Sequence, residues 1–317
     1  SLARMPSDTD FSIFEVGMNN YGEISYLSKM IKPDIGLINN AGSAHIKHFK
    51  SKKEIEKEKL ELIHGLNSGG SLVLNEDISI NKSIKNFSKK NNIELIKFGQ
   101  KDKSNNFLIN YRYFPDGSLI EANFDTISLS FKMFAPGLHM ALNAIAVLSV
   151  CNILDLPLGF IIKKLTNFNP VEGRGLTYDL SFRNKKIKII KDSFNANPES
   201  MISSINLLND MDAFENNRKI GYNTDIFGFT ESLKINSINN IKAMIIMGTG
   251  GAAKTIIYFC KKNKIPFNIV SRRKSKDYLS YKDIDHSFFK GNVLIVNCTP
   301  VGTYPDINKC PDLPYNL

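Results

Sequence analysis

The chain has 317 residues, and 42% of them are hydrophobic, which is enough apolar material for buried cores in two domains of about 150 residues each. Its formal net charge of +10 is spread along the chain without a basic and aromatic recognition module, so no nucleic-acid partner is predicted. No apolar run reaches the roughly 18 residues of a membrane span and no signal peptide is visible, so we predict a cytoplasmic protein with no membrane partner. The four cysteines lack Cys-x-x-Cys spacing, which argues against a zinc site and favours reduced thiols.

Apolar periodicity predicts alternating strands and helices from the N-terminus to about residue 210. Strands are predicted over 12–16, 35–39, 71–74, 93–98 and 187–190, and helices over 23–30, 52–66, 138–154 and 199–209. Two further segments, 107–114 and 118–134, are separated by the turn residues Pro115-Asp116-Gly117 and predict an antiparallel addition to the sheet. This alternation favours an α/β fold with mainly parallel sheets.

A strand, a tight turn and a helix follow one another in the last third of the chain. Residues 242–247 are apolar, Gly248-x-Gly250-x-x-Ala253 comes next, and residues 252–262 have helical spacing. Gly248 permits the turn, Gly250 lets backbone amides approach a pyrophosphate, and Ala253 allows close packing of a helix whose N-terminus favours anions. The pattern predicts a Rossmann-type dinucleotide-binding domain.

The end of the second strand of this unit indicates which dinucleotide binds. Residues 267–270 form the predicted strand, and Ser271-Arg272-Arg273 follows where an NAD site places an acidic residue. Arginines there favour the 2′-phosphate of NADP. The alternative is a glycine-rich loop in an ordinary core, with the two arginines on a solvated surface.

Four segments resemble the shikimate dehydrogenase family: 221–229, 247–253, 271–273 and 296–302. The resemblance implies that NADP is bound by Gly248, Gly250, Gly251, Ala252, Ala253, Ser271, Arg272 and Arg273, with Asn297, Thr299 and Gly302 along the nicotinamide. It also implies that Asp225 is the catalytic and substrate-binding carboxylate for shikimate, with Asn223 beside it. The family's Ser-x-Asn-x-Thr-x-Pro-x-Lys motif does not occur in this sequence, so we expect NADP binding to persist more readily than turnover.

The first two thirds of the chain resemble the Mur ligase family. The motifs that carry the resemblance lie, in chain order, at 15–19, 22–24, 40–45, 57–61, 135–144, 173–174 and 192–201. The last three of these segments narrow the resemblance to the branch that adds D-alanyl-D-alanine to UDP-N-acetylmuramoyl-tripeptide in peptidoglycan precursor synthesis, and Asn195-Ala196-Asn197-Pro198 is the most discriminating part. The implied domains are a Mur-ligase-like central α/β domain over 1–170, the start of a C-terminal ligase domain over 171–212, and a Rossmann-type NADP-binding domain over 213–317.

The ligase resemblance implies ATP and Mg²⁺ as cofactors, because such a ligase joins a carboxylate to an amine after transferring a phosphoryl group from ATP. Glu15, His45 and Lys59 are implied around the metal. Of these, His45 and Lys59 count as catalytic, and Lys59 becomes carbamoylated and so turns into an anionic oxygen ligand. The residues implied on the nucleotide side are Asn75, Asn143, Arg174, Asn195 and Asn197.

Ordinary structural interpretations compete with these assignments. His45 fits a loop histidine, the charged run 52–59 fits a solvated helix with i,i+4 ion pairs, and Asn195-Ala196-Asn197-Pro198 fits a turn and helix cap.

No Gly-x-x-x-x-Gly-Lys-Ser/Thr phosphate loop occurs, Met140 replaces the family's usual asparagine, and Lys191 replaces its usual aspartate. Three hypotheses stay open: a ligase fused to a dehydrogenase segment, a nucleotide-binding protein without catalysis, and an accidental join of two pieces in a chain truncated at its start.

Overall fold

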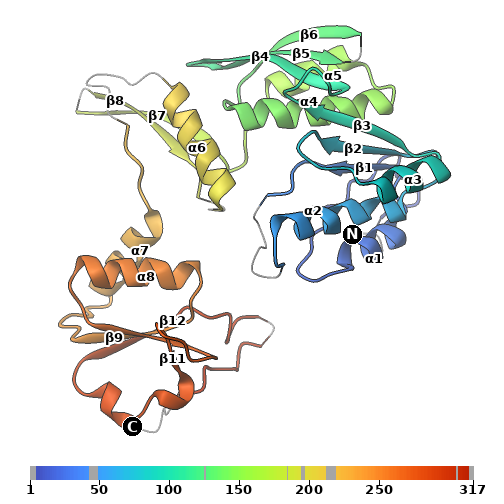
Figure 1. Ribbon diagram of the computed structural model, residues 1–317. Coiled ribbons are helices and arrows are strands. Elements are labelled where there is room, and N and C mark those ends of the chain that lie inside the picture. The colour runs from blue at the N-terminus through green and yellow to red at the C-terminus, as the bar shows by residue number, and fades with distance from the viewer. Residues whose placement is uncertain are drawn as a thin grey trace. The chain divides into compact units, whose positions relative to one another are not determined.

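The computed structural model describes residues 5–42, 49–124, 126–183, 185–193, 197–211, 219–304 and 306–313. The chain divides into two compact units, residues 1–219 and residues 220–317 (Figure 1). Both units are α/β, as predicted, with a mixed six-stranded sheet in the first and a parallel four-stranded sheet in the second. Among the described residues, no helix has the length and apolar character needed to cross a bilayer.

The six-stranded sheet of the N-terminal unit has the order β1-β2-β3-β4-β5-β6. Its strands β1 (Ile35–Ile38), β2 (Ser71–Asn75), β3 (Glu94–Gly99) and β4 (Asn106–Phe114) pair in parallel. In β2, Leu72 and Leu74 pack into one core with the 3₁₀ segment η2 (Glu61–Gly65), whereas Val73 packs into another with α4 (Leu138–Ile153). The uninterrupted apolar run of β2 therefore reflects burial on both faces.

The antiparallel addition consists of β5 (Gly117–Phe124) and β6 (Ile127–Met133). The predicted turn after β4 is confirmed, and Gly117 has a φ of 137°, a backbone conformation that favours glycine. The single segment predicted over 118–134 is wrong. The chain reverses near Thr126, and β5 and β6 pair with each other along their whole length.

Five α-helices accompany this sheet among the described residues: α1 (Glu23–Ile31), α2 (Lys52–Leu60), α3 (Lys82–Lys90), α4 and α5 (Leu158–Thr166). The helix predicted over 52–66 ends at Leu60 and continues as η2, which lies so close to α1 that a Cβ on Gly65 would come within 2.2 Å of the Ser28 carbonyl carbon. The strand predicted over 12–16 is wrong. Ile13 is 98% exposed and no described strand pairs with this segment, so its apolar alternation has no sheet to join.

Residues 171–211 add a hairpin and a helix to the N-terminal unit. Strands β7 (Leu176–Phe182) and β8 (Lys185–Lys191) pair in antiparallel register. The helix α6 (Pro198–Asp210) begins after Asn197, whose side chain accepts a hydrogen bond from the amide of Ser200, and Pro198 occupies the first turn, where its fixed φ suits a helix start.

The C-terminal unit is built on a parallel sheet with the order β11-β10-β9-β12. Its elements are α7 (Thr224–Ile235), β9 (Ala243–Met247), α8 (Gly251–Lys262), β10 (Phe267–Ser271), β11 (Leu279–Ser280) and β12 (Val293–Asn297). Met244 and Ile246 of β9 pack with α8, whereas Ile245 and Met247 pack into a second core on the opposite face. The predicted strand, turn and helix are confirmed, and the strand order, numbered within this unit, is 3-2-1-4, which is part of the order of a Rossmann sheet.

Glu76 holds the loop between β3 and β4 against the end of β2. Its carboxylate accepts hydrogen bonds from the backbone amides of Gln100 and Lys101 at 3.0 and 2.9 Å and from the Ser104 hydroxyl at 3.1 Å. Its side chain is 9% exposed. Burial acts to raise the pKa of Glu76, but the hydrogen bonds outweigh burial and lower the pKa below its ordinary value.

Replacing Glu76 with glutamine should lower the free energy of unfolding by about 1–3 kcal/mol at neutral pH, because two amides lose a charged acceptor. Because the folded pKa is lowered, this stability is present above the ordinary value of 4.5 and is lost as pH falls through the folded pKa. Urea unfolding at neutral and acidic pH should therefore show the gap between wild type and variant narrowing in acid. Glu121→Gln, which weakens an exposed contact to Asn110, is the matched control. A gap that stays constant with pH would contradict this role for Glu76.

Candidate functional site

The residues just beyond the carboxyl end of β1 connect two of the predicted ligase residues. Lys59 Nζ on α2 donates to the carbonyl oxygen of Asn40 at 2.7 Å. Asn39 Nδ2 donates to Asn143 Oδ1 on α4 at 2.6 Å. Asn75 ends β2, which runs parallel to β1, so it lies at the same edge of the sheet. The structure thus brings Lys59, Asn75 and Asn143 to the carboxyl edge of the parallel strands, where open α/β sheets place their ligands.

Lys59 is half-buried on the last turn of α2. Burial lowers the pKa of its amine, since a buried ammonium loses hydration. A lysine with a lowered pKa carries more of the neutral amine, which is the nucleophilic form, at a given pH.

Other charged side chains of α2 bind backbone and loop groups rather than one another. Glu58 is buried and accepts a hydrogen bond from the amide of Gly22 at 2.6 Å, and burial raises the pKa of Glu58. Glu54 accepts a hydrogen bond from the Tyr21 hydroxyl at 2.5 Å. The exposed Lys52, Lys53 and Lys57 fit the predicted solvated helix, but its glutamates contact other segments in place of the predicted i,i+4 ion pairs. These glutamates tie the segment before α1 to the helix that carries Lys59.

His139 is a candidate residue that the sequence predictions did not single out. It lies in the first turn of α4, between Gly137 and Asn143, and is partly buried. Burial lowers the pKa of His139, and the charge of Asp192 acts in the opposite direction, so the segment after β8 lies near the start of α4. The signal was present in the sequence, because both residues fall within the segments 135–144 and 192–201.

The other predicted nucleotide-side residues that the structure describes lie on three different segments of the chain. Asn75 Oδ1 accepts from the amide of Asp77 at 3.0 Å, which fixes the turn after β2. Arg174 lies exposed in the turn before β7. Asn197 is the N-cap of α6, which confirms the helix-cap interpretation for this residue. Asn195 lies outside the described residues.

The predicted metal-side residues are not brought together by the part of the chain that the structure describes. Glu15 is exposed in a segment with neither helix nor strand, and His45 lies outside the described residues. Among the described residues, no group of three or more His, Cys, Asp or Glu side chains is placed to hold a metal ion.

In the C-terminal unit, three strands end side by side. Val270 of β10, Met247 of β9 and Asn297 of β12 occupy one row of the parallel register, so the residues that follow them share one edge. At that edge Gly248 has a φ of 105°, and a Cβ there would lie 2.8 Å from the carbonyl oxygen of Cys298. Only glycine fits this turn without strain.

The helix after this turn begins with free backbone donors. The N-cap of α8 is Gly250, and no side chain caps the helix. Gly251 and Ala252 in the first turn are exposed residues, whereas Ala253 is fully buried against the sheet. An uncapped helix start beside a tight glycine turn is a ready site for a pyrophosphate.

The basic residues after β10 differ in whether they are paired with a carboxylate. Ser271, Arg272 and Arg273 line a surface hollow, and both arginines are exposed. Lys274 is instead paired with Asp283 at 2.9 Å. Hydrogen bonds from the Ser280 amide, Lys274 and the Ser280 hydroxyl lower the pKa of Asp283 to about 2, which keeps it ionised as the partner of Lys274. Arg272 and Arg273 are therefore the cations available to an anion at this strand end.

The loop after β12 is organised by Asn297. Its Oδ1 accepts from the amide and the hydroxyl of Thr299 at 2.9 and 2.6 Å, and its Nδ2 donates to the carbonyl oxygen of Val301 at 2.9 Å. Gly302 has a φ of 86° in the same loop. Asn297, Thr299 and Gly302 therefore belong to one structured turn at the carboxyl edge of the sheet.

Asn223 and Asp225 lie at the start of α7. Asn223 Oδ1 accepts from the amides of Asp225 and Ile226 at 2.9 and 3.2 Å as the N-cap of the helix. The Asp225 carboxylate is exposed in the first turn. The structure gives Asn223 a capping role and leaves the Asp225 side chain accessible to solvent.

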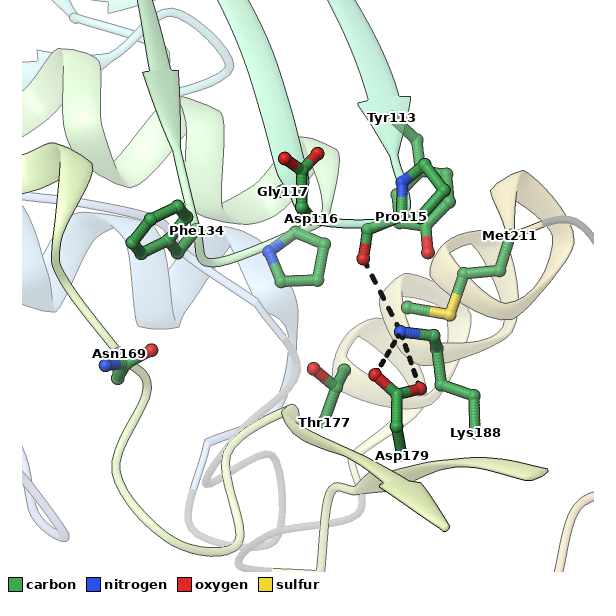
Figure 2. A pocket seen from close by; sticks show the side chains of 11 residues that line it. Tyr113, Pro115, Asp116, Gly117, Phe134, Asn169, Thr177, Asp179, Lys188 and Met211 are labelled. Atoms are coloured by element: carbon green, nitrogen blue, oxygen red, sulfur yellow. Dashed lines mark hydrogen bonds and ion pairs between the residues drawn. The ribbon is translucent and has the colours of Figure 1, made fainter. Parts of the chain in front are cut away.

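A separate hollow of about 270 Å³ lies between the β4–β5 turn and the β7–β8 hairpin. Figure 2 shows Lys188 at its wall, with Nζ 3.0 Å from Asp179 Oδ1 and 3.5 Å from the carbonyl oxygen of Pro115. None of the predicted site residues lines this hollow, and its only lysine is already paired.

Comparison with protein families matches residues 1–151 to the Mur ligase middle domain. The UDP-N-acetylmuramoyl-tripeptide–D-alanyl-D-alanine ligase of Rickettsia prowazekii is 29% identical over 223 residues, which are 70% of this chain and 49% of the relative. That of Escherichia coli is 26% identical and covers 68% of this chain and 46% of the relative. The shikimate dehydrogenase (NADP(+)) of Methanococcus vannielii is 32% identical over 120 residues, which are 32% of this chain and 42% of the relative. The chain thus spans half or less of the length of these curated relatives.

Solved structures give the same picture of the fold. A crystal structure of MurF from Acinetobacter baumannii matches with a TM-score of 0.59 at 17% identity, covering 93% of this chain and 63% of that chain. The MurF ligase of Thermotoga maritima in complex with ADP matches with a TM-score of 0.53 at 18% identity, covering 87% of this chain and 61% of that chain. Residues 1–151 match the Mur ligase middle domain, the first two thirds of the chain resemble the D-alanyl-D-alanine-adding ligases, and a shorter part of the chain resembles shikimate dehydrogenase.

Proposed function

We propose that the N-terminal unit acts in ATP-dependent amide-bond formation in the cytoplasm, adding D-alanyl-D-alanine to UDP-N-acetylmuramoyl-tripeptide for peptidoglycan synthesis. The observation that carries this proposal is the loop after β1. Its Asn40 carbonyl receives the half-buried Lys59, and its Asn39 side chain contacts Asn143. A candidate carbamate site and a candidate nucleotide residue therefore share one short loop, in a unit whose family match is a Mur ligase middle domain.

Lys59 has the protonation behaviour that a carbamate requires. The neutral amine attacks CO₂, so that a new N–C bond forms as one C–O π bond breaks, and a proton of the amine passes to water. Burial lowers the pKa of Lys59 and so raises its neutral fraction. The carbamate is an anionic oxygen ligand of the kind that Mg²⁺ prefers, and with Glu15 and His45 it completes the proposed metal-side set.

The nucleotide side supports a second candidate function. We assign ATP contacts to Asn75, Asn143, Arg174, Asn195 and Asn197, but the sequence contains no phosphate loop to cradle the γ-phosphoryl group. The second candidate is therefore a nucleotide-binding protein without amide formation. Incubation with ATP, Mg²⁺, the tripeptide nucleotide and D-alanyl-D-alanine separates the two candidates. Amide product supports the ligase, whereas binding of the adenine nucleotide without amide product supports the second candidate.

For the C-terminal unit we propose NADP binding. The turn at Gly248, with Gly250 and the exposed, uncapped first-turn residues Gly251 and Ala252, fits a pyrophosphate, and Ala253 lets the helix pack closely. Ser271, Arg272 and Arg273 fit the 2′-phosphate, and the turn formed by Asn297, Thr299 and Gly302 fits the nicotinamide side. Bound NADP would supply a hydride acceptor. The exposed Asp225, with Asn223 beside it, is our candidate to bind shikimate and hold the alcohol proton.

The carbamate proposal predicts a nuclear magnetic resonance signal that does not depend on catalysis. With ¹³C-bicarbonate, the chain should show a carbamate resonance that strengthens as pH rises toward the lowered pKa of Lys59. Lys59→Arg should remove this resonance, because a guanidinium offers no neutral amine. Lys57→Arg, at an exposed position of the same helix, should leave it unchanged. Persistence of the resonance in Lys59→Arg would rule out Lys59 as the site. A carbamate on the α-amino group is expected in every variant and serves as an internal reference.

The NADP proposal predicts a loss of cofactor discrimination. Replacing both Arg272 and Arg273 with alanine should weaken NADP⁺ binding by about 10–100-fold, because charge-assisted hydrogen bonds to the 2′-phosphate are lost, and should leave NAD⁺ binding nearly unchanged. Isothermal titration with both dinucleotides measures the two effects. Lys274→Ala is the matched control: it removes a neighbouring cation that is engaged with Asp283, so NADP⁺ affinity should change by less than about threefold. Equal losses for NADP⁺ and NAD⁺ would contradict 2′-phosphate recognition.

A further inference from the structure

Asn39 contacts the side chain of Asn143, which is one of the proposed nucleotide residues. It is the first residue after β1, is exposed, and has no role in the ligase or dehydrogenase assignments. Its Nδ2 donates to Asn143 Oδ1 at 2.6 Å across 104 positions of sequence. The carboxamide oxygen of Asn143 is thereby engaged.

The other end of the Asn143 carboxamide is left with a weak partner. Among the described residues, the partner of Asn143 Nδ2 is the thioether sulfur of Met140 at 3.9 Å, and a thioether is a poor acceptor. An amide nitrogen carries two donors, so Asn143 retains N–H groups for a ligand while its oxygen is occupied. The Asn143 side chain can therefore donate a hydrogen bond to a ligand.

The loop that carries Asn39 receives one further hydrogen bond and has one close neighbour. Lys59 Nζ donates to the carbonyl oxygen of the adjacent Asn40 at 2.7 Å. Two residues further on, a Cβ on Gly42 would lie 3.4 Å from the Glu199 carboxyl carbon, so the loop passes close to the start of α6. A loop with these contacts gives the Asn39 donor a fixed origin, which is what orienting a second side chain requires.

We propose that Asn39 is a positioning residue that holds Asn143 with its amide nitrogen available, so that this site selects a hydrogen-bond acceptor atom of an adenine nucleotide. The inference rests on the proposed nucleotide-side role of Asn143. Asn39 acts through Asn143 and need not touch the nucleotide itself. Without the Asn39 donor, the Asn143 carboxamide can rotate by about 180° and place its oxygen toward the ligand. Two acceptor atoms would then face each other and repel.

A double-mutant cycle with MgADP as the probe tests this coupling. Asn39→Leu keeps the side-chain shape but removes the donor, and should weaken MgADP binding by about 3–10-fold, the loss expected for one hydrogen bond. In the Asn143→Ala background the same substitution should cost nothing further, because the group that Asn39 orients is gone. Asn110→Leu, which removes another exposed amide contact at Glu121, is the control and should leave affinity unchanged. An equal cost of Asn39→Leu in both backgrounds, or no cost in either, would overturn the proposal.

A measurement without ligand separates failure of this inference from failure of the proposed function. In the ¹H–¹⁵N spectrum of the ligand-free chain, a side-chain amide proton of Asn39 should lie downfield and should move upfield in Asn143→Ala. If it does not move, the orienting contact is absent and the inference fails whether or not ADP binds. If it moves but the wild-type chain binds no MgADP, the nucleotide role of Asn143 is wrong and the selection of a nucleotide acceptor fails with it.

Discussion

The carboxyl edge of parallel strands is the constraint on which both candidate sites depend. The carboxyl ends of parallel strands lie at the same edge of a sheet, so residues that follow strands ending in one row lie close together. In the N-terminal unit this brings Asn39 and Asn40 beside the end of β2, and in the C-terminal unit it aligns the residues after Val270, Met247 and Asn297. Each site is thus assembled by backbone pairing before any side chain is considered.

Side-chain contacts determine which groups are available at these strand ends, and the contacts differ between the two units. The C-terminal unit leaves backbone amides uncapped at the start of α8 and engages the nearby Lys274 with Asp283, so that an anion meets amides and Arg272 and Arg273. The N-terminal unit instead uses charged residues of α2 as tethers. Buried Glu58 holds the amide of Gly22, and Lys59 reaches the loop after β1, so a helix with little apolar surface is fixed by polar contacts to backbone.

Periodicity in the sequence predicted the elements whose burial follows from local pattern. The apolar run of β2, the long helix α4 and the strand, turn and helix around Gly248 are where the sequence placed them. The predicted strand over 12–16 failed because alternation alone does not supply a partner, and Ile13 remains exposed. The contact between Asn39 and Asn143 could not be predicted, since it joins residues 104 positions apart through tertiary packing. The charges of α2 were misjudged for the same reason: their partners lie on other segments.

We propose that the chain carries two separate nucleotide-binding edges, one in each unit. This proposal is tested most directly by calorimetric titration of MgADP into the intact chain, alone and with saturating NADPH. Two independent edges require one MgADP site whose affinity is the same in both titrations, and one NADPH site that MgADP does not displace. Displacement of either ligand by the other would mean that MgADP and NADPH bind at the same strand edge, and would contradict two independent sites.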